Sequence, residues 1–422
     1  MSNQVSTLEG LFKERYADQV TVLVPDHVKL YNEVKFETSK KVGDSYNEPV
    51  VLSLESGFTY GGAGGSLFDL NDAKEFKMKN AKVQAREIVL RSAISYGALS
   101  RSQGSEQAIE KSMDLMVGNM LKSMYHRLEI QMFYGQEGLA EVKTDSVGGA
   151  PSEAIAILET EWAAGIWNGT TNAVVDVFDP TLTTKRGEYE IEGYSLSDKT
   201  VTLKKAAGNI GAAEIVDGDV IYFKGAADTG AVKNEFKGIH SIAAETSSLF
   251  SIANANEPLF QGSIVNVGAS AASLAVLSLE KIETGIAAMV EKGLLESDVD
   301  CYVNPKQWKD LLTEQDAKRQ YDSSYGEEAV AGHKKLKFYG QNGGINVIAS
   351  TFVKEGNAYI VNTKDLKRIG STEVTFKRPD GVSFLEQLEG KHGIEMRCYT
   401  DQALFTARPA SICILQHIKT DQ

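Results

Sequence analysis

The chain has 422 residues, 42% of them hydrophobic and 24% charged, which is typical of a globular protein large enough for several hydrophobic cores. With 44 Lys and Arg against 57 Asp and Glu, its net charge is −13, so it repels nucleic acid on average and has no basic patch that predicts sequence-specific DNA binding. No apolar run is long enough to span a bilayer, and the N-terminus lacks the features of a signal peptide. The odd set of cysteines, Cys301, Cys398 and Cys413, indicates reduced, buried thiols in a protein that folds in a cytosol.

The first predicted segment, residues 1–37, has the character of an arm. Residues 8–16 fit a short helix, and residues 20–24 and 28–36 fit extended chain. The segment has too little apolar surface for a core of its own. We therefore expect it to lie on a neighbouring domain or subunit.

Residues 38–100 follow a strand-like pattern around a glycine run. Residues 50–60 lead into Gly61, Gly62, Ala63, Gly64 and Gly65, and alternation of polar and apolar residues resumes over 76–91. This pattern predicts a long β-hairpin with a flexible tip. A phosphate-binding loop is the alternative, but the run lacks a following Gly-Lys-Ser/Thr and opens no helix. A two-stranded hairpin cannot form its own core, so it must reach another surface.

Residues 105–135 predict one long helix. Apolar residues recur every three or four positions, as on one helical face: Ile109, Met113, Met116, Met120, Met124, Leu128 and Met132. Ser105 fits the N-cap, and Gly135 fits a left-handed residue just past the end. About thirty residues would make a rod of roughly 45 Å, typical of a spine beneath a sheet or between subunits. A long core helix is the plainer alternative.

The second half of the chain alternates between β and α/β patterns. Residues 154–267 contain short strands such as 188–192 and 200–204, which predict a small barrel or sandwich. From 268 to 370, helices near 278–293 and after Asn304-Pro305 alternate with strands, which predicts an α/β lobe. This lobe would carry an exposed loop at 319–335. The tail, 371–422, returns to strands.

No constellation of residues predicts catalysis or cofactor binding. The six histidines lie in different elements, and neither a metal-binding motif nor a Gly-x-Ser-x-Gly elbow occurs. Asp298 and Asp300 could be paired carboxylates or a polar strand edge. Likewise, Glu188, Glu190 and Glu192 could hold a metal or form a solvated outer face. We expect no catalytic, cofactor or metal site, and no enzyme.

The order of these parts resembles the major capsid protein of tailed bacteriophages, the Hong Kong 97 fold, over nearly the whole chain. Leu54–Tyr60 and Ala85–Ile88 look like the two limbs of that family's extended loop. Val216–Phe223 is similar to an inserted β domain, and Tyr302–Leu311 resembles the axial lobe. The resemblance implies an α+β fold with these parts: arm 1–37, extended hairpin loop 38–100, spine helix and start of the peripheral domain 101–153, inserted β-barrel-like domain 154–267, axial α/β domain 268–370, and returning peripheral strands 371–422. No scaffolding segment is expected ahead of the arm.

The resemblance implies that the chain self-assembles, as hexamers and pentamers, into an icosahedral shell around the double-stranded DNA of a tailed phage. Assembly would take place in the cytoplasm of the host bacterium, with portal, scaffolding and decoration proteins as further partners. The DNA would be held without sequence-specific binding, and no membrane would be involved. An encapsulin-type nanocompartment shell is the alternative of the same fold; a β-rich glycan-active enzyme and a tail or adhesion protein are others. The expected subunit contacts are Tyr60, Gly61, Gly62, Gly64, Gly65, Arg86, Glu87, Tyr321 and Tyr325.

Overall fold

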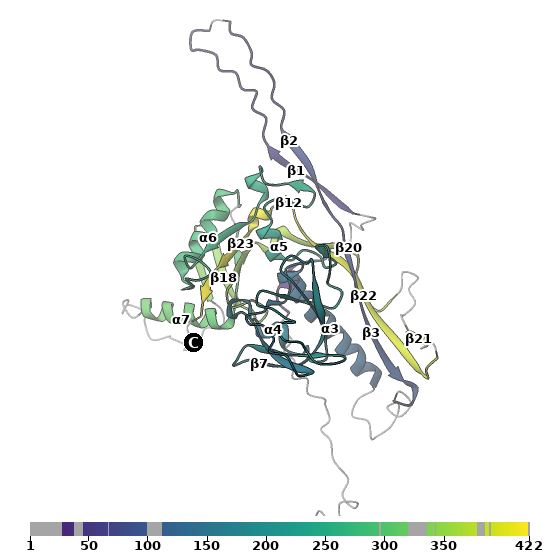
Figure 1. Ribbon diagram of the computed structural model, residues 1–422. Helices are drawn as coiled ribbons and strands as arrows, with labels where there is room; N and C mark the ends of the chain where they lie inside the picture. Colours follow the sequence, from purple (N-terminus) through teal and green to yellow (C-terminus); the bar gives the residue numbers. More distant parts are fainter. Residues whose placement is uncertain are drawn as a thin grey trace, which may run out of the picture. The chain divides into compact units, whose positions relative to one another are not determined.

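The computed structural model describes residues 28–37, 45–65, 67–98, 112–294, 297–319, 336–341, 343–377, 385–387 and 390–420 (Figure 1). Tyr321 and Tyr325, most of the arm and the start of the predicted spine helix lie outside these ranges. The chain divides into two compact units. The first draws its described residues from Ile88–Tyr125 and Val374–Thr400, and the second from His27–Glu87, His126–Glu373 and Asp401–Gln422.

The first unit is built on a sheet of long strands. β22 (Gly393–Thr406), whose residues after Thr400 belong to the second unit, pairs with β21 (Leu385–Gln387) and with β3 (Arg86–Ser95); its further neighbour β20 (Leu366–Thr375) belongs almost wholly to the second unit. Along β3, exposed and half-buried residues alternate, as expected for a strand with one covered face. The structure therefore differs from the predicted hairpin, because residues 86–91 belong to this sheet and not to the hairpin's descending limb.

The long helix is α3 (Ser112–Tyr134), whose 23 described residues make a rod of roughly 35 Å. Its predicted apolar face is confirmed where it can be followed, since four of the residues on that face are buried: Met120, Met124, Leu128 and Met132. The end of the helix differs from prediction. A Cβ on Gly135 would lie 2.1 Å from the carbonyl oxygen of Phe236, so glycine is needed for close approach, and the left-handed residue is Gln136 at φ 74°.

The start of the second unit corrects the prediction of extended chain over 28–36. Leu30–Glu33 form one helical turn, α1. The carboxylate of Glu129 in α3 accepts hydrogen bonds from the backbone N–H groups of Lys29, Leu30 and Tyr31 at 3.0, 3.0 and 2.8 Å. These are donors that a first helical turn leaves unsatisfied, so a side chain about a hundred positions away stabilises the turn.

The segment after α1 is fixed by Arg368 of β20. Its guanidinium lies 3.8 Å over the ring of Tyr31, and its Nε donates to the carbonyl oxygen of Val34 at 2.8 Å. The backbone N–H of Arg368 also donates to the carbonyl oxygen of Lys35 at 3.0 Å. Residues 28–37 thus pack against their own chain.

A six-stranded antiparallel sheet follows α3, in the order β4-β9-β6-β7-β8-β5. Its edge strands meet through a bridge between Val142 and Ile157, so the sheet closes into a small barrel. Large side chains fill its interior: Tyr189, Ile191, Val201, Leu203 and Ile221. The strands are β4 (Ala140–Glu141), β5 (Ser152–Ala156), β6 (Val174–Phe178), β7 (Lys185–Ser195), β8 (Thr200–Lys205) and β9 (Val220–Phe223).

The α/β part of the second unit is a mixed six-stranded sheet, in the order β14-β23-β19-β16-β18-β17. Cys301 and Cys413 lie in its core as free, buried thiols, as predicted, and burial raises the pKa of Cys413 to about 12. Its elements are β14 (Ser263–Asn266), α6 (Leu279–Glu291), β16 (Val299–Val303), α7 (Pro305–Arg319), β17 (Leu336–Gly340), β18 (Gly343–Ala349), β19 (Ala358–Val361) and β23 (Ile412–Gln416).

Both helices of this part begin as the sequence predicts. The Ser278 hydroxyl accepts from the backbone N–H of Lys281 ahead of α6, and Gly293, at φ 91°, follows its end. The Asn304 side chain accepts from the backbone N–H of Lys306 at 3.0 Å, with Pro305 in the first turn of α7.

Short elements complete the second unit. The short helices are α4 (Ala164–Trp167), α5 (Ile239–Ala244), η3 (Glu159–Glu161), η4 (Pro258–Phe260), η5 (Thr363–Asp365) and η6 (Pro409–Ser411). The short strands are β10 (Ala227–Asp228), β11 (Val232–Lys233), β12 (Ser248–Leu249), β13 (Ile252–Ala253), β15 (Ala275–Val276) and β24 (Ile418–Lys419).

Candidate assembly surfaces

A two-stranded ribbon extends from the second unit between Tyr46 and Val83. β1 (Tyr46–Ser53) pairs antiparallel with β2 (Lys77–Val83), and Figure 1 shows the two limbs continuing side by side beyond these strands. We call residues 54–76 the tip segment and residues 77–86 the root segment. The ribbon is the candidate assembly surface because, among the described residues, no third strand pairs with it.

The root of the ribbon is fixed to the second unit by several contacts. The ring of Tyr46 meets Phe405 edge-on at 5.3 Å, and the backbone N–H of Lys82 donates to the carbonyl oxygen of Phe250 at 2.7 Å. Lys77 forms an ion pair with Glu257. These contacts hold the direction in which the ribbon leaves the unit.

Hydrogen bonds continue between the limbs beyond the regular strands. The Ser53 hydroxyl accepts from the backbone N–H of Lys77 at 3.0 Å. Farther out, the Asn71 side chain donates to the carbonyl oxygen of Phe58 at 2.9 Å, and its backbone N–H donates to the Thr59 hydroxyl at 2.8 Å. The limbs therefore stay together over most of the tip segment.

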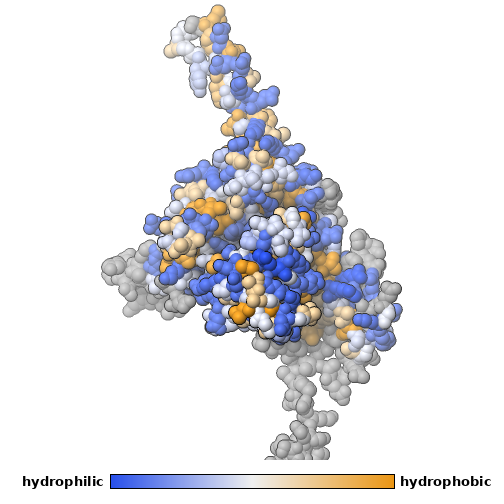
Figure 2. All heavy atoms as spheres, viewed as in Figure 1, coloured by the Kyte–Doolittle hydropathy of each residue, from blue (hydrophilic) through white to orange (hydrophobic). Residues whose placement is uncertain are grey.

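The tip segment exposes large apolar side chains that its own chain does not cover. Tyr60 is 89% exposed, Leu54 83% and Leu67 fully exposed. Figure 2 shows orange, apolar residues interspersed with blue, polar ones along this ribbon. Other exposed apolar residues there are Phe58, Phe68, Leu70 and Phe76. Such a concentration of exposed apolar residues in one element marks an interaction surface.

The predicted contact residues fall at opposite ends of the ribbon. Tyr60 and the glycines Gly61, Gly62, Gly64 and Gly65 lie together at its far end, where Gly65 has φ 64°. A Cβ on Gly61 would overlap the ring of Phe68, whereas Gly62 and Gly64 face open space. No helix follows the glycines, so they do not form the phosphate-binding arrangement.

Arg86 and Glu87 instead begin β3 at the root and are exposed. Leu67, Phe68 and Leu70 are exposed apolar residues that were not predicted. Their exposure could have been predicted from the sequence, because a two-stranded hairpin cannot bury apolar residues in a core of its own.

Four of the five acidic residues considered from the sequence have partners in their own chain. Glu188 pairs with Lys224 at 2.7 Å, and Glu192 lies 3.7 Å from Lys204. Asp300 accepts from the side chains of Asn346 and Thr363, each at 3.0 Å, and Asp298 accepts from the backbone N–H of Gly344 at 2.8 Å. Across the described part of the chain, no group of three or more His, Cys, Asp or Glu residues could hold a metal ion.

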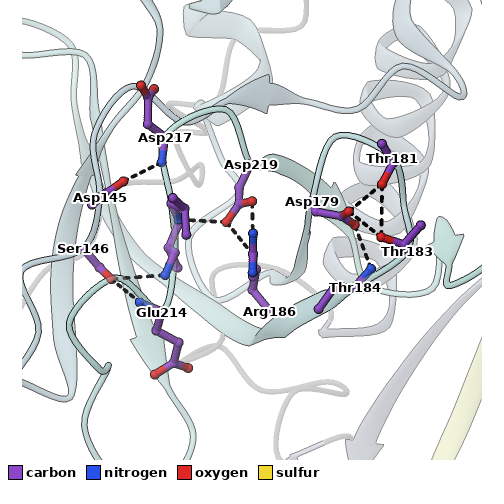
Figure 3. Close-up of polar contacts among 12 residues, drawn as sticks. Asp145, Ser146, Asp179, Thr181, Thr183, Thr184, Arg186, Glu214, Asp217 and Asp219 are labelled. Atoms are coloured by element: carbon purple, nitrogen blue, oxygen red, sulfur yellow. Dashed lines mark hydrogen bonds and ion pairs between the residues drawn. The ribbon is translucent and has the colours of Figure 1, made fainter.

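Polar side chains also hold the loops of the barrel together (Figure 3). Buried Asp219 accepts from Arg186 Nε at 3.0 Å and from the backbone N–H of Val216 at 2.8 Å. Asp179 accepts from the hydroxyls of Thr181 and Thr183, both at 2.6 Å, and these bonds hold its pKa below the usual range. These carboxylates organise turns of the barrel.

Among the described residues, no helix is both long and apolar enough to cross a bilayer. No protein-family model and no curated protein matches the sequence. Solved structures do match it over nearly its whole length. The capsid asymmetric unit of cyanophage A-1(L) aligns with a TM-score of 0.55 at 10% identity, covering 99% of both chains.

The capsid of an empty GTA particle aligns with a TM-score of 0.54 at 9% identity, again over 99% of both chains. A structure of Gordonia phage Cozz aligns with a TM-score of 0.50 at 9% identity, covering 100% of this chain and 96% of that one. The chain has the phage capsid fold. The α+β fold of the Hong Kong 97 type that the order of parts implied is thereby confirmed.

Proposed function

We propose that this protein is a major capsid protein that assembles into the icosahedral shell around the double-stranded DNA of a tailed bacteriophage. The observation that carries the proposal is the ribbon with exposed apolar residues, on a chain whose whole length has a capsid fold. A ribbon that one chain cannot bury becomes stable when it lies across another copy. The role is structural, with no catalytic step.

In this proposal, hexamers and pentamers tile the shell. The parts follow the order expected from the sequence, with the pairing of the hairpin loop ending at Val83: arm, hairpin loop, spine, inserted β domain, axial lobe and returning strands. Tyr60, the tip glycines, Arg86 and Glu87 contact other subunits, as do Tyr321 and Tyr325 near the capsomer centre. A net charge of −13 is compatible with a DNA-filled shell if the genome is packed by a motor and not held by the wall.

The proposal further includes assembly in the host cytoplasm, with portal, scaffolding and decoration proteins as partners. Electron microscopy of the purified protein is the first test, with closed shells as the expected result. Shells isolated from the natural source should contain nuclease-protected double-stranded DNA. Enclosed enzyme in place of DNA would favour the nanocompartment alternative, and a compact monomer under all assembly conditions would contradict both.

The ribbon can be tested within the same experiment. Replacing residues 59–70 by Asn-Gly should leave soluble capsomers or monomers, because the exposed apolar surface is removed while the root contacts remain. The control is Gly193→Ala, in strand β7 of the barrel and outside the proposed contacts, since a Cβ there meets nothing within 4 Å. The control should form normal shells. Normal shells from the shortened ribbon would exclude the ribbon as an essential contact.

A further inference from the structure

The ribbon is electrically polarised along its length. The tip segment, residues 54–76, contains the acidic residues Glu55, Asp69, Asp72 and Glu75 and one base, Lys74, so its net charge is one minus four, −3. The root segment, residues 77–86, contains four bases and no acid, so its net charge is +4: Lys77, Lys79, Lys82 and Arg86. One end of the element is therefore acidic and apolar, and the other is basic.

The acidic charges of the tip have no partner among the described residues of their own chain. Within the described residues, none of the tip's four carboxylates forms an ion pair or accepts a side-chain hydrogen bond. The ~12 residues from Ser53 to Gly65, at ~3.3 Å each, extend roughly 40 Å, so the tip cannot fold back onto its own root while the limbs stay paired. Its complementary surface must come from another molecule.

A hollow beside the root has the matching chemistry. It has a volume of about 310 Å³, and the bases Lys82, Arg86 and Lys237 line it together with apolar Phe236 and Phe250. Lys237 is paired with Glu245 at 2.8 Å, whereas Arg86 has no ion pair among the described residues. A second hollow, of about 390 Å³, has Lys292, Arg408 and Asp365 in its wall, so a carboxylate opposes an acidic ligand there.

We propose that the tip segment of one copy docks in the root hollow of the next copy. Asp69 and Asp72 face Lys82 and Arg86, and the apolar side chains beside them, such as Leu67, cover the apolar wall. This inference rests on the proposed function and specifies the partner surface. Because tip and root are different surfaces, the contact is heterologous, and repeating it around an axis closes a ring. Opposite charges at the two ends also fix the order of copies around that ring.

Charge reversal tests the contact. Asp69→Lys with Asp72→Lys, or Lys82→Glu with Arg86→Glu, places like charges at every contact. Each pair of changes should raise the concentration needed for assembly by more than about tenfold. The protein carrying all four changes restores opposite charges and should assemble near the concentration of the unmodified chain. Thermal unfolding of the unassembled tip variant should be unchanged, because Asp69 and Asp72 are exposed, and the same measurement on the root variant separates any loss of stability from loss of docking.

Matched controls carry the same change in net charge elsewhere. Lys364→Glu with Lys419→Glu matches the root variant, and Asp217→Lys with Glu291→Lys matches the tip variant; all four positions are exposed. Both controls should assemble normally. A mixture of the tip variant and the root variant should form rings with equal amounts of each and an even number of copies. Native mass spectrometry would read out this composition.

Different failures have different meanings. If the unmodified chain assembles and the reversed variants assemble equally well, tip and root do not meet and the inference is wrong, while the proposed function stands. Failure of the four-change protein to recover, with both controls normal, also overturns it. If the root variant assembles normally while Lys292→Glu with Arg408→Glu blocks assembly, the tip docks in the second hollow and the inference is wrong. If the unmodified chain never assembles, the proposed function itself fails.

Discussion

The barrel and the ribbon both contain antiparallel strands and large apolar residues, but these residues are buried in the barrel and exposed in the ribbon. In the barrel strands, Leu203 and Ile221 are fully buried, whereas Leu67, in the limb of the ribbon that continues beyond β2, is fully exposed. The difference lies in topology. Six strands that close through Val142 and Ile157 enclose an interior, and two strands cannot. Apolar residues in a strand therefore indicate burial only when the number of strands allows an inside.

Two leucine substitutions give the sharpest test of this contrast. Leu203→Ala should lower the free energy of unfolding by ~2–5 kcal/mol, because it leaves a cavity in a closed interior. Leu67→Ala should change it by less than ~0.5 kcal/mol, because that side chain has no neighbours to lose. Urea unfolding of dilute, unassembled protein measures both. Similar losses for the two variants would mean that the ribbon folds against its own chain in solution.

Buried and exposed carboxylates extend the comparison to charge. The acids of the tip are exposed, whereas Glu129 is fully buried beneath α1. Burial raises the pKa of Glu129 to about 7, although the backbone N–H groups of residues 29–31 and the charge of Lys29 act in the opposite direction. In the unfolded chain, a glutamate has its ordinary pKa near ~4.3.

This difference predicts the sign of a pH dependence. The folded state holds the Glu129 proton more firmly, so its contribution to stability is complete below the unfolded pKa and is lost as the pH rises towards 7. The loss is at most ~1.4 kcal/mol for each pH unit in that window. Glu129→Gln should flatten this part of the curve, measured by urea unfolding at a series of pH values. Glu55→Gln, in the tip, should leave it unchanged; equal slopes in all three proteins would place the Glu129 pKa near its ordinary value.

The elements that the sequence predicts well are those whose pattern is local. The apolar face of α3, the start of α6 near residue 278 and its end at Gly293, and the strand around 200–204 each depend on residues within a few positions of one another. A helical or strand period needs no knowledge of the partner. These elements were therefore correct in kind and nearly correct in extent.

The errors all involve contacts between distant parts of the chain. Residues 86–91 continue the alternation of the hairpin, but they pair with β22, some three hundred positions later. The turn at Leu30–Glu33 forms because Glu129 reaches it, and Gly135 is needed because Phe236 lies against it. Strand partners and side-chain caps of this kind are set by tertiary structure, which overrides local preference.

The candidate surface was predictable in the same limited sense. The glycine tip and Tyr60 follow from the hairpin pattern, because a turn between two alternating segments must be exposed. The position of Arg86 and Glu87 at the far end from Tyr60 does not follow, because it depends on where pairing between the limbs stops. The charge polarity of the ribbon could be counted in the sequence, but it had no meaning until the end of pairing at Val83 was known.

Removing two exposed leucines of the tip segment should hardly change the free energy of unfolding but should weaken assembly strongly. Leu67→Ala combined with Leu70→Ala should leave the free energy of unfolding within ~0.5 kcal/mol of the original, since both side chains are exposed in the single chain. In the assembled state, each leucine would lose ~1.5–3 kcal/mol of burial, so the concentration threshold for shell formation should rise at least tenfold. Light scattering against protein concentration measures the threshold. Leu196→Ala, at an exposed leucine of the barrel, is the control; an equal rise there would show that exposed apolar residues drive assembly without regard to the ribbon.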